Sequence, residues 1–392
     1  MAVFIRRVLL RNFKSIASCD VQLEPLTFLV GANGAGKSNF VDALRFVADS
    51  LRGPMDHALR ERGGIHEVRR RSGGHPTNFS VRLELTLPNS RAGYYSFEVA
   101  AKKGAFEVSH ERCEFEQATY VVERGVVKRA SEQIMPPATS DRLYLTNAAG
   151  LPAFRPIFDA LSRMGFYNLN PDAMRELQDP DAGEVLRRDG SNITGVLARM
   201  WRDPARRERV IELLGKVVPG TVDVEVKRLG HKETLEFRQR GENQTWVFPA
   251  LSMSDGTLRA LGVLVALFQE DAAGGVPFVA IEEPEVALHP AAAGVLIDAL
   301  RAASKRTQVL VTSHSPDLLD DERLTAEEIR AVIAREGKTE IARVDEAARG
   351  ALQKHLYTAG ELLRLDQLLP DEEELDRARK AQLSFFDGEL QA

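Results

Sequence analysis

Cysteine is nearly absent from this sequence: the 392 residues contain only Cys19 and Cys113, which lie far apart along the chain. Two distant cysteines argue against a disulfide framework or a zinc site, and they are typical of a reducing compartment. Long apolar runs are also missing, since no stretch approaches the ~20 residues that a membrane-spanning helix requires. The N-terminal stretch MAVFIRRVLLRNF is too short in its apolar part and too charged for a signal peptide. We therefore expect a cytoplasmic protein.

Sustained heptads, internal repeats and a charge excess over the main part of the chain are missing as well. Without heptads, we expect no long coiled coil. The net charge is −5, but residues 366–392 hold eight acids and three bases, so the other 365 residues carry 49 charges of each sign. The overall acidity therefore does not exclude a polyanionic partner, and the acidic part is the C-terminal tail.

The first half of the chain changes from strand-like to helix-like patterning. Residues 3–30 and about 78–128 alternate as strands and hairpins do, whereas residues 153–216 have mostly helical character. Residues 52–75 contain six arginines, three acids and three histidines, and we predict a solvated loop there. Such charge would touch the phosphates of DNA without reading bases, although a plain solvated loop is the commoner explanation.

The second half has the order strand, helix, strand that is typical of parallel α/β folds. A helix is predicted over residues 254–269, and buried strands are predicted at 277–283 and 308–314. A hairpin that turns at Gly337 follows. These elements predict an α/β fold with a large buried core.

A phosphate-binding loop is the strongest motif in the chain. GANGAGKS at residues 31–38 matches G-x-x-x-x-G-K-[ST] and lies between an apolar strand and an amphipathic helix. Its glycines let backbone N–H groups surround phosphate oxygens, and the helix that follows points its positive end at the same oxygens. Lys37 is predicted to reach the β- and γ-phosphates, and the Ser38 hydroxyl to ligate Mg²⁺. The predicted nucleotide-binding residues are Asn33, Gly34, Ala35, Gly36, Lys37, Ser38 and Asn39.

Two carboxylates end the predicted strand at 277–283. Acids at the carboxyl end of a buried parallel strand are in the expected place for a ligand site of an α/β fold. Glu282 is the candidate Mg²⁺ partner, and Glu283 is the candidate that positions and activates the attacking water. Taken alone, EEPE is as consistent with a solvated polar turn, and the upstream phosphate loop favours the catalytic interpretation.

Two further segments are weaker candidates. Ser254, Asp255 and Gly256 precede an apolar helix, where Ser254 is placed to cap the helix and Gly256 to leave its entry open to a phosphate. Taken alone, this segment favours an ordinary helix cap. His314 follows the second buried strand and is a candidate sensor of the γ-phosphate, although a structural histidine is the usual occupant of such a position.

Together these segments resemble the ABC-type ATPases, and within them the RecF-like and SMC-like branch and its compact "AAA family ATPase" subgroup. The resemblance covers the chain to about residue 345. It is carried by LRNFKS at 10–15, GANGAGKSNFVDAL, DGSNITGVLARM at 189–200, LSMSDGTLRAL, IEEPEVALHP and TSHSPDLL. The resemblance implies an ABC-ATPase head with a mostly parallel central sheet, an antiparallel β N-lobe and a helical insertion. The implied domains are a single head over 1–365, with an N-lobe at 1–150, an insertion at about 151–249 and a C-lobe at 250–365, and an acidic tail at 366–392.

The resemblance also implies roles for the weaker segments. Ser254, Asp255 and Gly256 would form the signature that contacts ATP bound to the opposite subunit, and Leu288 and His289 would lie in the loop that crosses the dimer interface. His314 would be the switch residue. The signature has SDG where transporters have SGG, Glu282 stands where many relatives carry Asp, and the position of the glutamine loop stays open.

The implied activity is ATP hydrolysis with ATP and Mg²⁺ as cofactors, at the interface of an ATP-dependent homodimer. Two processes that ATP hydrolysis would drive stay open. One is a DNA-associated role in repair or anti-phage defence, with a nuclease or other effector partner. The other is the switching of a protein partner without DNA contact. A transporter motor fits least. Residues Gln382–Phe386 resemble the short peptide that binds the bacterial sliding clamp, although docking of this segment on the protein itself is the commoner outcome.

Overall fold

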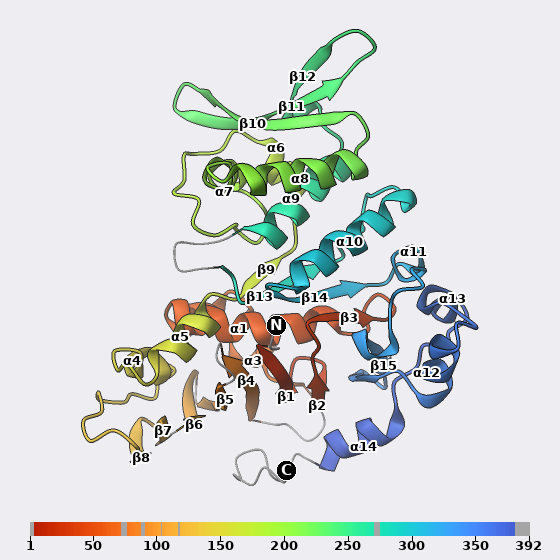
Figure 1. Cartoon of the computed structure of the whole chain (residues 1–392). Coiled ribbons are helices and arrows are strands. Elements are labelled where there is room, and N and C mark those ends of the chain that lie inside the picture. The colour runs from red at the N-terminus through yellow and green to blue at the C-terminus, as the bar shows by residue number, and fades with distance from the viewer. Residues whose placement is uncertain are drawn as a thin grey trace. The chain divides into compact units, whose positions relative to one another are not determined.

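The computed structural model describes residues 4–71, 77–87, 91–102, 104–116, 118–269 and 275–380, and the chain separates into two units (Figure 1). Unit 1 comprises Met1–Met164, Thr325–Tyr357 and Leu365–Ala392. Unit 2 comprises Gly165–Leu324 and Thr358–Arg364. Each unit therefore combines segments that are distant in sequence. Among the described residues, no helix has both the length and the apolar character needed to cross a bilayer.

Unit 1 is built on a mixed β-sheet. Its strands lie in the spatial order β8, β7, β6, β5, β4, β1, β2, β16, β15 and β3. Neighbours from β8 to β2 pair antiparallel, and β16 with β2 and β15 with β3 pair parallel. The bounds are β1 Ile5–Phe13, β2 Ile16–Gln22, β3 Leu26–Val30, β4 Asn78–Leu87, β5 Arg91–Lys102, β6 Ala105–Phe115, β7 Ala118–Glu123, β8 Val126–Ala130, β15 Ile329–Arg335 and β16 Lys338–Arg343. The hairpin of β15 and β16 turns at Gly337, as predicted, with a φ of 71°.

Helix α1 (Lys37–Arg52) carries the apolar face that its sequence predicts. Phe40, Leu44, Val47 and Leu51 recur at helical spacing, and all four are buried. Arg52 in the last turn donates from Nε to the carbonyl of Ser162 and from Nη2 to that of Met164, both at 2.5 Å. These bonds tie α1 to the end of α5 (Arg155–Ser162).

The loop predicted over residues 52–75 is helical in part. Two short helices occupy it, α2 (Met55–Arg60) and α3 (Ile65–Val68). Their buried apolar residues are Met55, Leu59, Ile65 and Val68, and the burial of these side chains stabilises the helices. The many glycines and arginines of the segment obscure this apolar pattern in the sequence. Residues 72–76 lie outside the described residues.

Two arginines of this segment have structural roles. Arg62, with a side chain only 1% exposed, binds Asp42 at 3.0 Å and Asp49 at 2.7 Å. Arg70 is also buried and donates to the carbonyl of Ser15 at 2.9 Å. Neither side chain is available to a polyanion, which weakens the case for a DNA-binding loop.

Unit 2 contains the parallel strands that the second half of the sequence predicts. β9 (Gly165–Tyr167), β13 (Phe278–Glu282) and β14 (Gln308–Ser313) pair in parallel, and the strands predicted at 277–283 and 308–314 are confirmed as β13 and β14. Helices α9 (Asp255–Phe268) and α10 (Ala293–Ser304) bury their apolar residues in the same unit. The short helices α6 (Pro171–Arg175), α11 (Pro316–Leu319) and α13 (Ala359–Arg364) complete its α/β part.

A second, antiparallel sheet of three strands also belongs to unit 2. β11 (Lys232–Arg240) pairs with β10 (Thr221–Leu229) and β12 (Thr245–Pro249). Helices α7 (Ile193–Met200) and α8 (Pro204–Val217) lie against this sheet, as Figure 1 shows. This layer lies within the range of about 151–249 where the sequence predicts a helical and β insertion, whereas residues 151–164 belong to unit 1, and the insertion as a domain stays a prediction.

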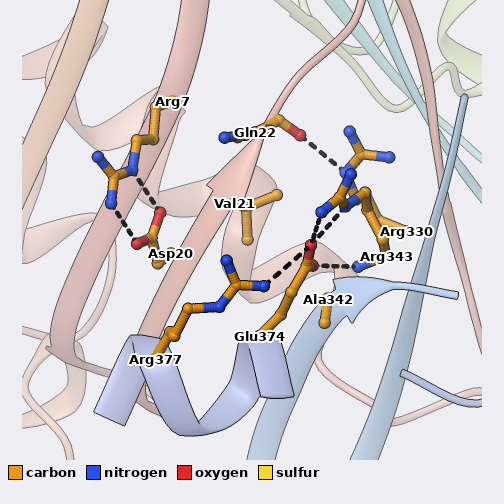
Figure 2. Close-up of a pocket in the computed structure, with 9 residues that line it drawn as sticks. All are labelled: Arg7, Asp20, Val21, Gln22, Arg330, Ala342, Arg343, Glu374 and Arg377. Atoms are coloured by element: carbon orange, nitrogen blue, oxygen red, sulfur yellow. Dashed lines mark hydrogen bonds and ion pairs between the residues drawn. The ribbon is translucent and has the colours of Figure 1, made fainter. Parts of the chain in front are cut away.

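The predicted acidic tail begins with an ordered helix. α14 (Glu372–Lys380) buries Leu375 and Ala378 and contacts β2 and β16 of unit 1. Figure 2 shows Glu374 of α14 bound to the backbone N–H and guanidinium of Arg343. Both residues line a pocket of about 190 Å³. The helix was missed because its apolar residues are few. Gln382–Phe386 lies outside the described residues.

Candidate functional site

The predicted site residues are divided between the two units. The phosphate loop belongs to unit 1, and the acidic strand end, the signature and the switch belong to unit 2. In unit 1, Thr339 contacts the phosphate loop, and in unit 2, His314 contacts Glu283.

The phosphate loop connects β3 to α1, in the strand–loop–helix context that its motif requires. Gly36 ends the loop at a φ of 103°, and a Cβ there would lie 1.9 Å from Oγ1 of Thr339. A side chain at this position is therefore excluded both by the backbone conformation and by the close approach of β16. Asn33, Gly34 and Ser38 are exposed, so the part of the loop that is expected to meet phosphate is open to solvent.

Lys37 lies over its own loop. Its side chain is buried, and Nζ donates to the carbonyls of Gly31 at 2.7 Å and Ala32 at 3.0 Å. A short rotation of the side chain would exchange the two carbonyls for phosphate oxygens, which are stronger acceptors.

A hydroxyl cluster under the loop was not predicted. Thr339 donates to the carbonyl of Ala35 at 2.9 Å and lies 2.7 Å from Oγ of Ser15. Ser15 in turn accepts from the Asn39 amide at 2.6 Å. Ser15 is the last residue of LRNFKS, one of the segments that carry the family resemblance. Through Thr339 and Asn39, its hydroxyl supports the base of the phosphate loop. Thr339 follows Ser15 by 324 positions, and no local pattern indicates their contact.

At the acidic end of β13, Glu283 meets His314. Glu282 is the last residue of β13, and Glu283 has a φ of +46°, with its N–H donating to the carbonyl of Thr312 on β14 at 3.0 Å. His314 Nδ1 lies 3.1 Å from Oε1 of Glu283. The structure therefore brings together the two residues predicted as catalytic, and both side chains are about one-third exposed.

Four further residues around this strand end were missed from the sequence. Ser313 donates to Glu285 at 2.6 Å, and burial raises the pKa of the Glu285 carboxyl. Arg259 of α9 lies with Nη1 3.5 Å from the carbonyl of Glu283, and Arg188 Nη2 lies 3.0 Å from Oε1 of Glu282. Only the order of strands in the folded sheet reveals these contacts, because each joins separate elements.

The signature segment is an ordered helix start. Ser254 caps α9 by accepting the N–H of Thr257 at 3.2 Å, which confirms the predicted cap. Asp255 is bound by Arg175 of α6 at 2.5 Å, and the same arginine reaches the carbonyl of Met253 at 3.2 Å. Ser254 is exposed, and its contact with a second subunit's nucleotide stays a prediction.

The predicted interface loop lies directly against the signature. A Cβ on Gly256 would come within 2.3 Å of the carbonyl of Ala287, so only glycine permits this approach. Leu288 follows, and exposed His289 accepts the N–H of Ala291 at 3.2 Å and starts the next turn. The signature and the loop of Leu288 and His289 therefore form one local surface of unit 2.

A family model described as "AAA domain, putative AbiEii toxin, Type IV TA system" matches residues 26–121 and 149–320. The matched residues include the phosphate loop, the signature, the acidic strand end and the switch histidine. They make up more than half of the chain.

Solved structures of SMC heads have the same fold. An SMC head bound to the C-winged-helix domain of ScpA matches with a TM-score of 0.57 and 16% identity, covering 88% of this chain and 99% of that one. An SMC head with an extended coiled coil from Pyrococcus furiosus, bound to the C-terminal domain of ScpA, matches with a TM-score of 0.56 and 13% identity, covering 90% and 99%. Structural maintenance of chromosomes protein 3 of Arabidopsis thaliana is 38% identical over 73 residues, which are 17% of this chain and 6% of that protein.

Proposed function

Because the chain belongs to this AAA-domain family and has the fold of SMC ATPase heads, we propose that it is an ATP-dependent switch that hydrolyses ATP at the interface of a head-to-tail homodimer. The observation that carries the proposal is the contact between His314 and Glu283 at the end of β13. A phosphate loop alone supports nucleotide binding, whereas a carboxylate held by a histidine supports activation of water.

The roles of the residues follow from the chemistry of phosphoryl transfer, which needs positioning and charge neutralisation. Lys37 and the loop N–H groups bind the phosphates. Glu283 aligns the attacking water and accepts its proton, while His314 fixes the carboxylate. Ser254 and Gly256 of the second copy complete the site around the γ-phosphate, so hydrolysis requires the dimer.

Magnesium fits the residues present. Ser38 offers an exposed hydroxyl and Glu282 a carboxylate, and oxygen donors of this kind are what Mg²⁺ prefers when phosphates and waters supply the remaining ligands. The ion would neutralise charge on the phosphates.

Exposed Asn168 follows β9, which runs parallel beside β13, and we propose it for the glutamine-loop role that the sequence left open.

For the process that hydrolysis drives, we propose a DNA-associated role in repair or defence, with an effector such as a nuclease. The description of the family as a toxin of toxin–antitoxin systems and the SMC relative support it. Switching of a protein partner without DNA contact is the second candidate, and the burial of Arg62 and Arg70 favours it.

A substitution at Glu283 tests the ATPase proposal. Glu283→Gln keeps the shape of the side chain and removes the base, so we expect ATP binding to persist and turnover to fall at least ~100-fold. The variant should accumulate as an ATP-bound dimer in light scattering, whereas Lys37→Ala should lose nucleotide affinity and stay monomeric. Glu322→Gln, at an exposed position of unit 2, is the matched control and should behave as wild type. A Glu283→Gln protein that remains monomeric at saturating ATP contradicts the dimer.

Mixing two inactive variants tests whether Ser254 acts on the partner's nucleotide. Lys37→Ala damages the loop and Ser254→Arg damages the signature, so a mixed dimer holds roughly one intact composite site. We expect each variant alone to be inactive and the mixture to recover ATPase activity. No recovery at any mixing ratio would show that Ser254 does not act across a dimer or that both sites must work together.

A further inference from the structure

Glu282, the proposed magnesium partner, forms an ion pair with an arginine. Nη2 of Arg188 lies 3.0 Å from Oε1 of Glu282, and the side chains are 46% and 12% exposed, respectively. We propose that Arg188 is the resident counter-ion of Glu282 and that a divalent cation must displace it when the nucleotide binds. This inference rests on the proposed function, because it assigns Glu282 to the cation.

The fold holds the backbone of Arg188 beside the strand end. β9 pairs with β13 up to Tyr167 and Ile281, so the residues after Tyr167 run next to Glu282. The N–H of Asn168 donates to the carbonyl of Arg188, and the N–H of Asn170 to that of Asp189, both at 3.0 Å. The loop that carries Arg188 is therefore fixed to the strand next to β13.

Turn hydrogen bonds stiffen the same loop. The N–H of Gly190 donates to the carbonyl of Arg187 at 2.9 Å, and the Asn192 amide oxygen accepts the N–H of Arg187 at 2.7 Å. Gly190 has a φ of 81°, and a Cβ there would lie 2.7 Å from Met174. Because the backbone is held at so many points, displacement of Arg188 means rotation of its side chain alone.

The surroundings allow that rotation. The Arg188 side chain is nearly half exposed, whereas Glu282 is mostly buried, so the arginine is the partner that can leave. An open depression of about 700 Å³ adjoins it, lined among others by Asn168, Asn170 and Ser191. Polar groups there can solvate a guanidinium that has lost its carboxylate.

Electrostatics sets the direction of the effect. A cation at Glu282 would meet a carboxylate already compensated by one positive charge, and like charges held a few ångströms apart repel. Arg188 therefore raises the Mg²⁺ concentration that nucleotide binding requires. It also prevents Glu282 from standing as an uncompensated carboxylate when no nucleotide is bound.

The test measures nucleotide binding and not turnover. Full-length protein is mixed with a fluorescent ATP analogue, and Mg²⁺ is added stepwise from a chelated start. For Arg188→Ala we expect the half-saturating Mg²⁺ concentration to fall about two- to fivefold, the scale of an ion pair near the surface. Arg188→Lys, which keeps the charge, should restore the wild-type value. Arg187→Ala is the matched control, because this neighbour pairs with Asp181 at 3.1 Å instead.

Each other outcome has a distinct meaning. An unchanged or increased Mg²⁺ requirement in Arg188→Ala overturns the inference and leaves the ATPase proposal intact. Mg²⁺-independent binding of the analogue by wild type also overturns it, since Glu282 then holds no cation. Failure of wild type to bind the analogue at all overturns both proposals. Urea unfolding of each variant reports whether the substitution has disturbed the fold.

Discussion

At the residue scale, the contact between Arg175 and Asp255 explains the departure in the signature. Transporters have glycine where this chain has Asp255, and a carboxylate next to a serine that is proposed to contact phosphate is unfavourable by itself. Here Arg175 pairs with it at 2.5 Å and also binds the carbonyl of Met253. The pair neutralises the acid and fixes the residue before the Ser254 cap. The SDG sequence is therefore compatible with an anion site at this helix end.

Glu111 is a fully buried carboxylate in unit 1, remote in sequence from the predicted site. It accepts from the hydroxyls of Tyr95 at 2.9 Å and Tyr120 at 2.8 Å. It also accepts the backbone N–H groups of Tyr144 and Leu145, which begin the short helix α4 (Leu145–Ala148). Burial raises the pKa of this carboxyl, although the four hydrogen bonds oppose the shift.

A pH dependence of stability follows from that raised pKa. The folded state holds the proton more tightly than the unfolded state, so the free energy of unfolding should fall as pH rises above the ordinary glutamate pKa of about 4.3. Glu111→Gln does not titrate, and it should cost roughly 1–3 kcal/mol because an amide cannot accept from all four donors. We expect the stability gap between wild type and Glu111→Gln to narrow between about pH 5 and about pH 8, measured by urea unfolding.

Glu114→Gln, on the same strand and more exposed, is the control for this measurement. Its stability gap to wild type should be small at both values of pH. A gap for Glu111→Gln that stays constant or widens with rising pH would contradict the assignment.

At the element scale, α14 shows how a charged segment becomes part of a core. Besides Glu374 with Arg343, Arg379 binds Glu340 at 2.8 Å and Arg335 binds Glu372 at 2.9 Å, so α14 is tied to the β15–β16 hairpin. Exposed pairs of this kind add little individually. The buried Leu375 and Ala378 contribute the larger share of the docking energy.

Two truncations separate the helix from the residues that follow it. A chain ending at Lys380 keeps α14, and a chain ending at Pro370 lacks it. We expect the shorter chain to lose roughly 2–3 kcal/mol in the unfolding of unit 1, mainly from the lost burial of Leu375, when urea unfolding is followed by circular dichroism. Equal stability of the two chains would show that α14 does not contribute to the stability of unit 1.

Clamp binding by Gln382–Phe386 stays a prediction, to be tested by titrating a fluorescent peptide of residues 376–392 with sliding clamp.

At the scale of the whole molecule, direct DNA contact is a question of which charges are exposed. Arg60 and Arg71 are 77% and 71% exposed, unlike the buried Arg62 and Arg70 of the same segment. If the segment binds phosphates, Arg60→Glu with Arg71→Glu should weaken ATP-stimulated duplex binding without changing ATP affinity. A plot of the log of the DNA association constant against the log of the salt concentration has a negative slope. Its magnitude should decrease by about 2, since each arginine accounts for about one phosphate contact.

The matched control changes the same charge elsewhere in unit 1. Arg142 and Arg155 are 52% and 61% exposed, and their double change to Glu should leave the salt slope as in wild type. Equal weakening by both double variants would indicate a general charge effect, and no weakening by either would favour the protein-partner alternative. Fluorescence anisotropy at several salt concentrations measures all of these.

Local sequence by itself determined the chemistry of the phosphate loop, the buried strands β3, β13 and β14, and the cap at Ser254. These features depend on neighbours within a few residues: glycine conformations, an apolar run ended by two acids, and a hydroxyl at a helix start. The family resemblance assigned His314 to the switch position, and only the sheet brings it to within 3.1 Å of Glu283.

Only the tertiary structure decided which polar and charged side chains pair with each other. Arg188 meets Glu282, Arg175 meets Asp255 and Thr339 meets Ser15 because strand order and loop anchoring place them together, at separations of 94, 80 and 324 positions. A charged side chain has the same local pattern whether it is solvated or paired, so its partner cannot be found from the sequence nearby. Burial, set by the packing of whole elements, makes Arg62 part of the core and leaves Arg60 on the surface.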